Sequence, residues 1–147
     1  MDLLFALFTG DALGVTPAVY AELVAGLREG QSFLQVAVEI VEAGALALLP
    51  LTAQEIVQRL ALPLSLNAGE AESIALCKSR GAAFVTNDRR ARNFCRTEGV
   101  EVFDLPEVLR AFWALRICSK QKVRQLVANI ETKEGLIIKH KGEIFAR

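Results

Sequence analysis

Short apolar runs alternate with longer segments of helical periodicity along most of the chain, and this alternation is its most restrictive feature. Four runs have the length and composition of strands: residues 12–15, 45–51, 82–86 and 100–103. Helical spacing marks eight further segments: residues 2–8, 16–28, 32–43, 52–60, 70–80, 89–98, 107–115 and 119–130. Strands that alternate with helices run parallel and are covered by the helices on both faces. The sequence therefore predicts an α/β fold with three α/β/α layers around a parallel sheet.

The length of 147 residues suits one domain of ordinary size. Hydrophobic residues make up 52% of the chain and charged residues 23%, a composition typical of folded proteins and not of disordered ones. No apolar run reaches the roughly 18 residues that a membrane span needs. Asp2 stands where a signal peptide carries Lys or Arg. We therefore expect a cytoplasmic protein without a membrane span.

The charges sum to zero but are unevenly distributed. Residues 1–109 carry 8 Lys or Arg against 14 Asp or Glu, a net charge of −6, whereas residues 110–147 carry 9 against 3, a net charge of +6. Such a basic end permits an anionic partner such as nucleic acid. A solvated basic tail explains it equally well.

The three cysteines, Cys77, Cys95 and Cys118, form no C-x-x-C pair, and the chain has a single histidine, His140. No zinc site can be written from this set, and an odd number of cysteines disfavours a disulfide scaffold. We interpret all three as reduced, buried thiols.

Three carboxylates lie at positions that suit either a structural role, such as helix capping, or a chemical one. Asp88 follows the predicted strand at 82–86, where it suits either the N-cap of the next helix or a hard cation at the sheet's open edge. Glu70 stands three residues after Asn67, the spacing of a capping box. Glu22 lies at the edge of the apolar stripe of its helix.

Taken together, the three acids fit one scheme. Two or three carboxylates that converge on Mg²⁺ or Mn²⁺ can lower the pKa of a bound water and offset the charge of a phosphodiester transition state. Such chemistry needs no His, Ser or Cys nucleophile. The arginines after Asp88 either contact phosphates or form a solvated face; they are Arg89, Arg90, Arg92 and Arg96.

These residues resemble the PIN domain, and more narrowly its prokaryotic branch of toxin nucleases from toxin–antitoxin pairs. The resemblance rests on GEAESIAL at residues 69–76, GA at 81–82, TNDRRAR at 86–92 and TPAVYAEL at 16–23. It covers residues 3–112, and the order of the segments is more specific than any one of them.

The resemblance implies a parallel sheet between helices and an Mg²⁺- or Mn²⁺-dependent ribonuclease held inactive by an antitoxin protein. It implies that Glu22, Glu70 and Asp88 are the catalytic, metal-binding acids, with Asn87 as a supporting polar residue. Glu70 is favoured over Glu72 because the family's acid falls about eleven residues before the glycine that Gly81 matches. Three arginines would face the RNA: Arg89, Arg90 and Arg92.

One feature departs from the family pattern. The family's first acid is an Asp at the end of an N-terminal strand, and neither Asp2 nor Asp11 occupies the matching position. The first strand is thus expected to be truncated. Three explanations compete for the missing strand and Asp. The start of the chain is wrongly assigned, the chain is a degenerate and non-catalytic homologue, or another segment fills the position of the missing strand. A missing strand would leave unpaired backbone and apolar surface, and this predicts a homodimer.

The sequence thus predicts a PIN-like domain at residues 1–115 and a basic C-terminal part at 116–147, with a helix and an edge strand at residues 136–139. The leading function is a metal-dependent ribonuclease of toxin type, impaired by the missing Asp. The alternative is a non-catalytic PIN-like module that binds protein or RNA. A nucleotide-binding α/β domain is disfavoured because no Gly-rich phosphate loop follows a strand.

Overall fold

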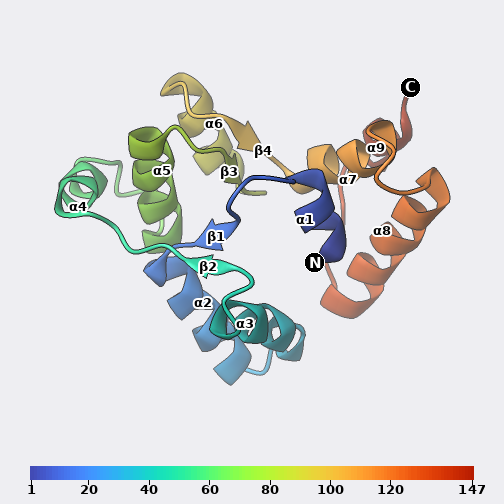
Figure 1. Ribbon diagram of the computed structural model, residues 1–147, viewed down its shortest axis with the longest axis horizontal. Helices are drawn as coiled ribbons and strands as arrows, with labels where there is room; N and C mark the ends of the chain where they lie inside the picture. The colour runs from blue at the N-terminus through green and yellow to red at the C-terminus, as the bar shows by residue number, and fades with distance from the viewer. The chain divides into compact units, whose positions relative to one another are not determined.

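A computed structural model describes residues 1–147 (Figure 1), which divide into two compact units. One unit is Ala12–Phe103, and the other combines Met1–Asp11 with Asp104–Arg147. The first unit contains the strands and most of the helices: β1 Gly14–Val15, α2 Pro17–Arg28, a 3₁₀ turn Ser32–Leu34, α3 Gln35–Glu42, β2 Ala47–Leu48, α4 Ala53–Leu60, α5 Ala68–Arg80, β3 Phe84–Val85, α6 Arg89–Thr97 and β4 Val102–Phe103. The second is helical: α1 Asp2–Leu7, α7 Leu105–Ala114, α8 Lys120–Glu134 and α9 Lys141–Phe145.

The prediction of an α/β fold with parallel strands is confirmed, but the strands form two pairs. β1 pairs with β2 in the register Gly14↔Ala47, and β3 pairs with β4 in the register Phe84↔Val102. Helices lie between the paired strands in the sequence, as parallel pairing requires. Each strand has two residues, shorter than the four to seven expected. Backbone hydrogen bonds nevertheless continue by one residue beyond the strands, at Leu13, Leu49, Glu101 and Thr86.

Helix ends follow local signals in the sequence. The Oγ1 of Thr16 accepts a hydrogen bond from the Val19 N–H, and Pro17 occupies the first turn of α2. α4, α5 and α7 each begin with a complete capping box. Gly81 ends α5 in the left-handed conformation, at φ 64°, which glycine adopts without strain.

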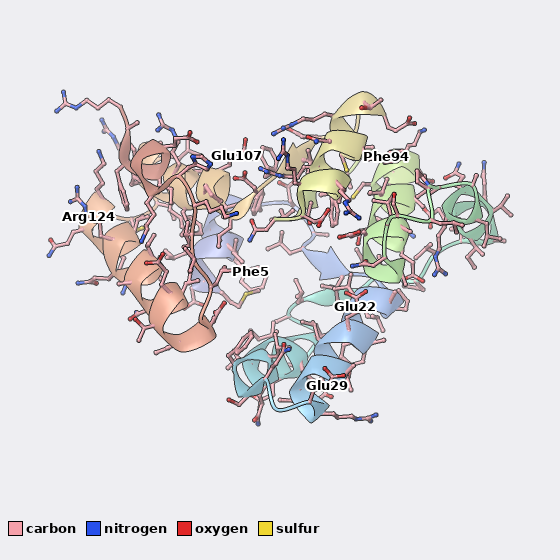
Figure 2. All side chains as sticks on the ribbon, turned by 180° about the vertical axis from the view of Figure 1, so that it is seen from behind. Phe5, Glu22, Glu29, Phe94, Glu107 and Arg124 are labelled. Atoms are coloured by element: carbon pink, nitrogen blue, oxygen red, sulfur yellow. The ribbon has the colours of Figure 1, made fainter.

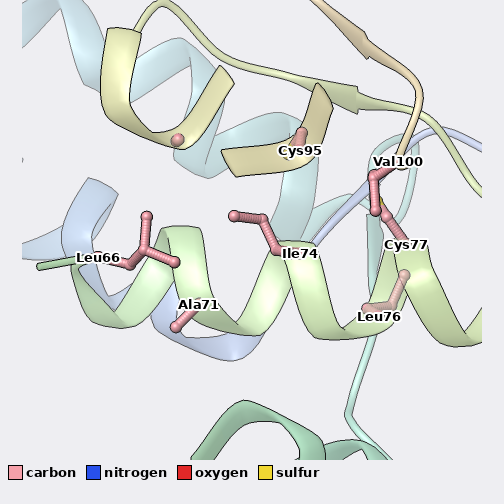
Figure 3. Close-up of a cluster of buried hydrophobic side chains, with 8 residues drawn as sticks. Leu66, Ala71, Ile74, Leu76, Cys77, Cys95 and Val100 are labelled. Atoms are coloured by element: carbon pink, nitrogen blue, oxygen red, sulfur yellow. The ribbon is translucent and has the colours of Figure 1, made fainter. Parts of the chain in front are cut away.

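The core of the first unit surrounds α5 (Figure 3). Ile74 and Cys95 are fully buried, and Cys77 lies in the same cluster. Burial raises the pKa of Cys77 to about 11 and raises that of Cys95 as well, so both are neutral thiols at pH 7. These two cysteines therefore act as small apolar side chains.

The C-terminal residues pack back on α7. The indole Nε1 of Trp113 donates to the Ile144 carbonyl oxygen at 2.7 Å, and the guanidinium of Arg110 donates to the carbonyl oxygens of Glu143 and Ala146. Lys120 lies 4.2 Å from the centre of the Trp113 ring. Part of the positive charge at this end thus stabilises the unit itself.

The predicted edge strand at residues 136–139 is wrong. This segment is a loop between α8 and α9. Ile138 is buried, and its backbone N–H donates to Glu131 Oε1 at 3.2 Å. A side chain therefore accepts the hydrogen bond that a neighbouring strand was expected to accept. The short helix α9 was not predicted. No helix is long and apolar enough to cross a membrane.

Candidate functional site

Glu22 binds the first turn of α5 rather than standing free on its own helix. Its Oε1 accepts a hydrogen bond from the Gly69 N–H at 3.1 Å, across 47 residues of sequence. Figure 2 shows Glu22 on α2. The N–H groups of a first helical turn have no partner within the helix and carry partial positive charge. A carboxylate at this place is therefore both hydrogen-bonded and electrostatically favoured.

Glu72 makes the reciprocal contact, which the sequence analysis missed. Its Oε2 accepts from the Ala18 N–H in the first turn of α2 at 2.8 Å, and its Oε1 lies 3.6 Å from Arg59 Nη1. α2 and α5 thus cap each other. The available signal was that the neighbours of Glu72 one helical turn away, Gly69, Ala75 and Leu76, are small or apolar, so Glu72 lies on a face that the fold buries.

Gly69 provides the room for this contact. A Cβ at residue 69 would lie 2.8 and 3.0 Å from the two Glu22 carboxylate oxygens and 3.0 Å from Val19 Cγ2. Only a residue without a side chain lets the Glu22 carboxylate approach the backbone this closely.

We expect Gly69→Ala to lower the free energy of unfolding by about 1 kcal/mol, because displacement of Glu22 loses a charge-assisted hydrogen bond worth more than alanine's helix propensity. Gly142→Ala is the matched control. Gly142 is also helical, but nothing lies within 4 Å of its added Cβ, so a gain of up to about 1 kcal/mol is expected. Urea unfolding of both variants measures the difference. Equal gains in stability would contradict the importance of the close approach.

Glu70 forms the capping box of α5. Its Oε2 accepts from the Asn67 N–H at 3.0 Å, and its own N–H donates to Asn67 Oδ1 at 2.8 Å. Glu22 and Glu70 therefore both bind N–H groups at the start of α5. Two of the three predicted acids are brought to one helix terminus.

Asp88 lies at the start of another helix, α6, just beyond β3. Its Oδ1 accepts from the Ala91 N–H at 2.8 Å, and its own N–H donates to Thr86 Oγ1 at 3.2 Å. Asn87, Arg89 and Arg90 around it are exposed, and Arg92 is half-buried; all four lie in the same unit as Glu22 and Glu70.

The arrangement only partly suits a divalent cation. Carboxylate oxygens are the ligands that Mg²⁺ and Mn²⁺ prefer. However, no group of three or more Asp, Glu, His or Cys side chains is placed so that it could hold a metal ion. Glu22, Glu70 and Asp88 instead bind backbone N–H groups at two helix starts. The donor chemistry fits, but the geometry does not fit as it stands.

Comparison with known proteins assigns the family. A family model described as a PIN domain matches residues 1–141, so the chain belongs to the PIN-domain family. Members of this family are typically nucleases that bind nucleic acid and generally use divalent metals. No curated protein and no solved structure matches the chain.

Proposed function

We propose that the chain is an Mg²⁺- or Mn²⁺-dependent ribonuclease of the toxin–antitoxin type, with Glu22, Glu70 and Asp88 as its metal-binding, catalytic acids. The observation that carries the proposal is that Glu22 of α2 and Glu70 of α5 both accept hydrogen bonds from N–H groups at the start of α5, from Gly69 and Asn67 respectively. Asp88 follows a strand end, where the sites of α/β folds lie. Because the three carboxylates are not grouped to hold a metal as they stand, they have to move toward one another to bind it.

The proposed partners follow from the same surface. Arg89 and Arg90 are exposed beside Asp88, and with Arg92 they would contact RNA phosphates. Asn87 would support the last acid. The other proposed partners are an antitoxin protein and a second copy of the chain, so the proposed form is a cytoplasmic homodimer. In each copy, the PIN-like domain is residues 1–115 and the basic part is residues 116–147.

A non-catalytic PIN-like module that binds RNA or protein is the second candidate. It is favoured by the helix-capping contacts, because each of the three carboxylates already stabilises a helix start. A family member that has lost catalysis can keep acids that its fold needs.

RNA cleavage and Mn²⁺ binding by the purified full chain test the proposal. We expect Glu70→Gln and Asp88→Asn each to lower cleavage by at least about 100-fold and to weaken Mn²⁺ binding measured by calorimetry. Glu29→Gln is the matched control, since Glu29 is an exposed acid at the opposite end of α2 from its capped start. It is expected to leave both measurements unchanged.

The two candidates give different results. Cleavage that is lost in the acid variants and kept in Glu29→Gln supports the nuclease. A folded chain that neither binds Mn²⁺ nor cleaves RNA contradicts it and supports the binding module. Cleavage unchanged in Glu70→Gln shows that the acids are wrongly assigned.

A further inference from the structure

The apolar side of α4 faces solvent. Ile56, Val57 and Leu60 are 46%, 66% and 76% exposed, and Leu64, just beyond the helix, is fully exposed. The spacing of the first three places them on one face of α4. A surface helix normally buries this face against the core, so α4 is inverted relative to the usual orientation.

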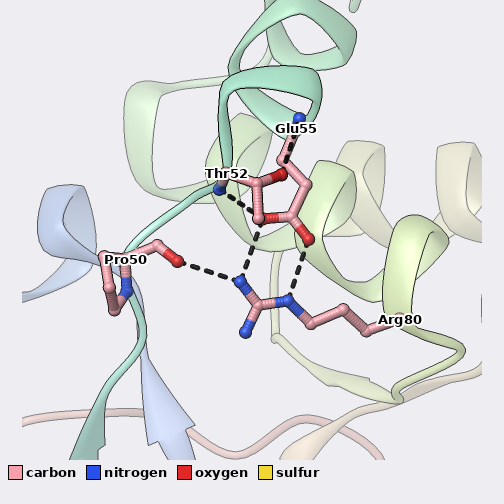
Figure 4. A network of polar contacts seen from close by, with 4 residues as sticks. All are labelled: Pro50, Thr52, Glu55 and Arg80. Carbon is pink, nitrogen blue, oxygen red and sulfur yellow. Dashed lines mark hydrogen bonds and ion pairs between the residues drawn. The ribbon is translucent and has the colours of Figure 1, made fainter.

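Ion pairs hold α4 in this orientation. Glu55 is 1% exposed, and its two oxygens accept from the Nε and Nη2 of Arg80 on α5 at 2.8 and 2.9 Å (Figure 4). Arg59 forms the second ion pair, with Glu72 of α5. The polar side of α4 is therefore attached to α5, and the apolar side is left without a partner in the chain.

The outward face of α4 also carries no charge. Its exposed residues are Ala53, Gln54, Ile56, Val57 and Leu60, and the exposed residues that follow, 61 and 63–65, are Ala, Pro, Leu and Ser. The two charged residues of the helix, Glu55 and Arg59, are the ones that pair with α5. Monomeric proteins rarely leave an apolar patch larger than a few hundred Å² uncovered.

We propose that this α4 face, formed by Ile56, Val57, Leu60 and Leu64, joins two copies of the chain in a dimer. A two-fold interface places a patch against itself, so a charge near the axis would meet its like and lose its hydration. An uncharged apolar face avoids both penalties. By contrast, the α4 face offers no counter-charge to a charged partner helix, so its lack of charge favours a second copy of the chain as the partner. The inference specifies the surface of the homodimer proposed above and does not depend on nuclease activity.

Sedimentation of the full chain over a concentration series tests the interface. The unsubstituted chain is expected to dimerise, and Leu60→Glu is expected to raise the dimer dissociation constant by about 100-fold or more, because dimerisation would bury two carboxylates. Val36→Glu is the matched control: Val36 is a 60% exposed valine on α3, away from this face in the sequence, and its variant should dimerise normally. Circular dichroism verifies that both variants are folded.

A cross-linking variant provides a test without an introduced charge. Val57→Cys, made together with Cys118→Ser, is expected to form a disulfide-linked dimer on oxidation, since Cys77 and Cys95 are buried. A monomeric unsubstituted chain, or a dimer that Leu60→Glu leaves intact, would overturn the proposed interface. RNA cleavage by the same samples is a separate measurement, so failure of the interface and failure of the nuclease proposal remain distinguishable.

Discussion

Replacement of Ile74 by alanine should lower the free energy of unfolding by about 2–5 kcal/mol. Ile74 is completely buried on α5 and belongs to the cluster in Figure 3. Alanine removes three carbons from a close-packed interior, and the neighbouring side chains can only partly fill the cavity. Because a domain of this size is stable by about 5–15 kcal/mol, the loss is a large fraction of the total.

Urea unfolding followed by circular dichroism measures this effect. Val36→Ala is the control, because Val36 is 60% exposed and its truncation should change stability by no more than about 0.5 kcal/mol. If the two substitutions cost the same, α5 is not the centre of the core. A lower urea midpoint of unfolding, with an unchanged slope of the free energy of unfolding against urea concentration, would show that the substitution lowered the stability of the packed state.

Loss of the Glu55–Arg80 ion pair should also strongly destabilise the chain. In Glu55→Gln the Arg80 guanidinium keeps its charge but loses the carboxylate that accepts two of its hydrogen bonds. Glu55 Oε2 also accepts from the Thr52 N–H at 2.8 Å, so the cap of α4 weakens at the same time. Glu55 is buried whereas Arg80 is partly exposed, so removal of the carboxylate leaves a guanidinium charge that water compensates only in part. We expect the midpoint of thermal unfolding to fall by several degrees.

The same pair makes stability depend on pH. Hydrogen bonds from Arg80, and from the Thr52 N–H, lower the pKa of Glu55 from 4.5 to about 2. A carboxyl whose pKa is lower in the folded state stabilises the fold above its unfolded pKa, and this contribution is lost as the pH falls. The unsubstituted chain should therefore lose stability between about pH 4.5 and 2, whereas Glu55→Gln should lose less over this range.

Urea unfolding at a series of pH values tests this dependence. Glu98→Gln is the control, because Glu98 pairs with Lys78 at the surface and such pairs contribute little. It should keep the acid slope of the unsubstituted chain. Equal slopes in all three proteins would show that the ion pair does not stabilise the fold.

Local signals predicted the helix ends, because each cap joins groups only three residues apart. Thr16 with Val19 and Asn67 with Glu70 are examples, and the capping role weighed for Asp88 is confirmed by its contact with the Ala91 N–H. The same locality explains the error at residues 136–139. An apolar run there matched a strand, but the side chain of Glu131 satisfies its backbone and Ile138 is buried in a helical unit.

The candidate site was predictable as a set of residue types but not as a set of contacts. The sequence indicated Glu22, Glu70 and Asp88 as the acids of a PIN-like chain, and their metal-binding role stays a prediction. The partner of Glu22 is a backbone N–H 47 residues away, and no periodicity along α2 identifies it. The contact of Glu72 was missed for the same reason, because its partner, the Ala18 N–H, is 54 residues away.

The sequence by itself determined the α/β class, the family and the positions of the helices other than α9, since all of these depend on short-range patterns of polarity and capping. Only the tertiary structure decided how the strands pair, that α2 and α5 cap each other, and that α4 turns its apolar side outward. These features depend on contacts between distant segments, such as Glu55 with Arg80, which are 25 residues apart. A charged residue on an amphipathic helix is expected to face water. Here Glu55 is buried instead, because the partly exposed guanidinium of Arg80 pairs with it.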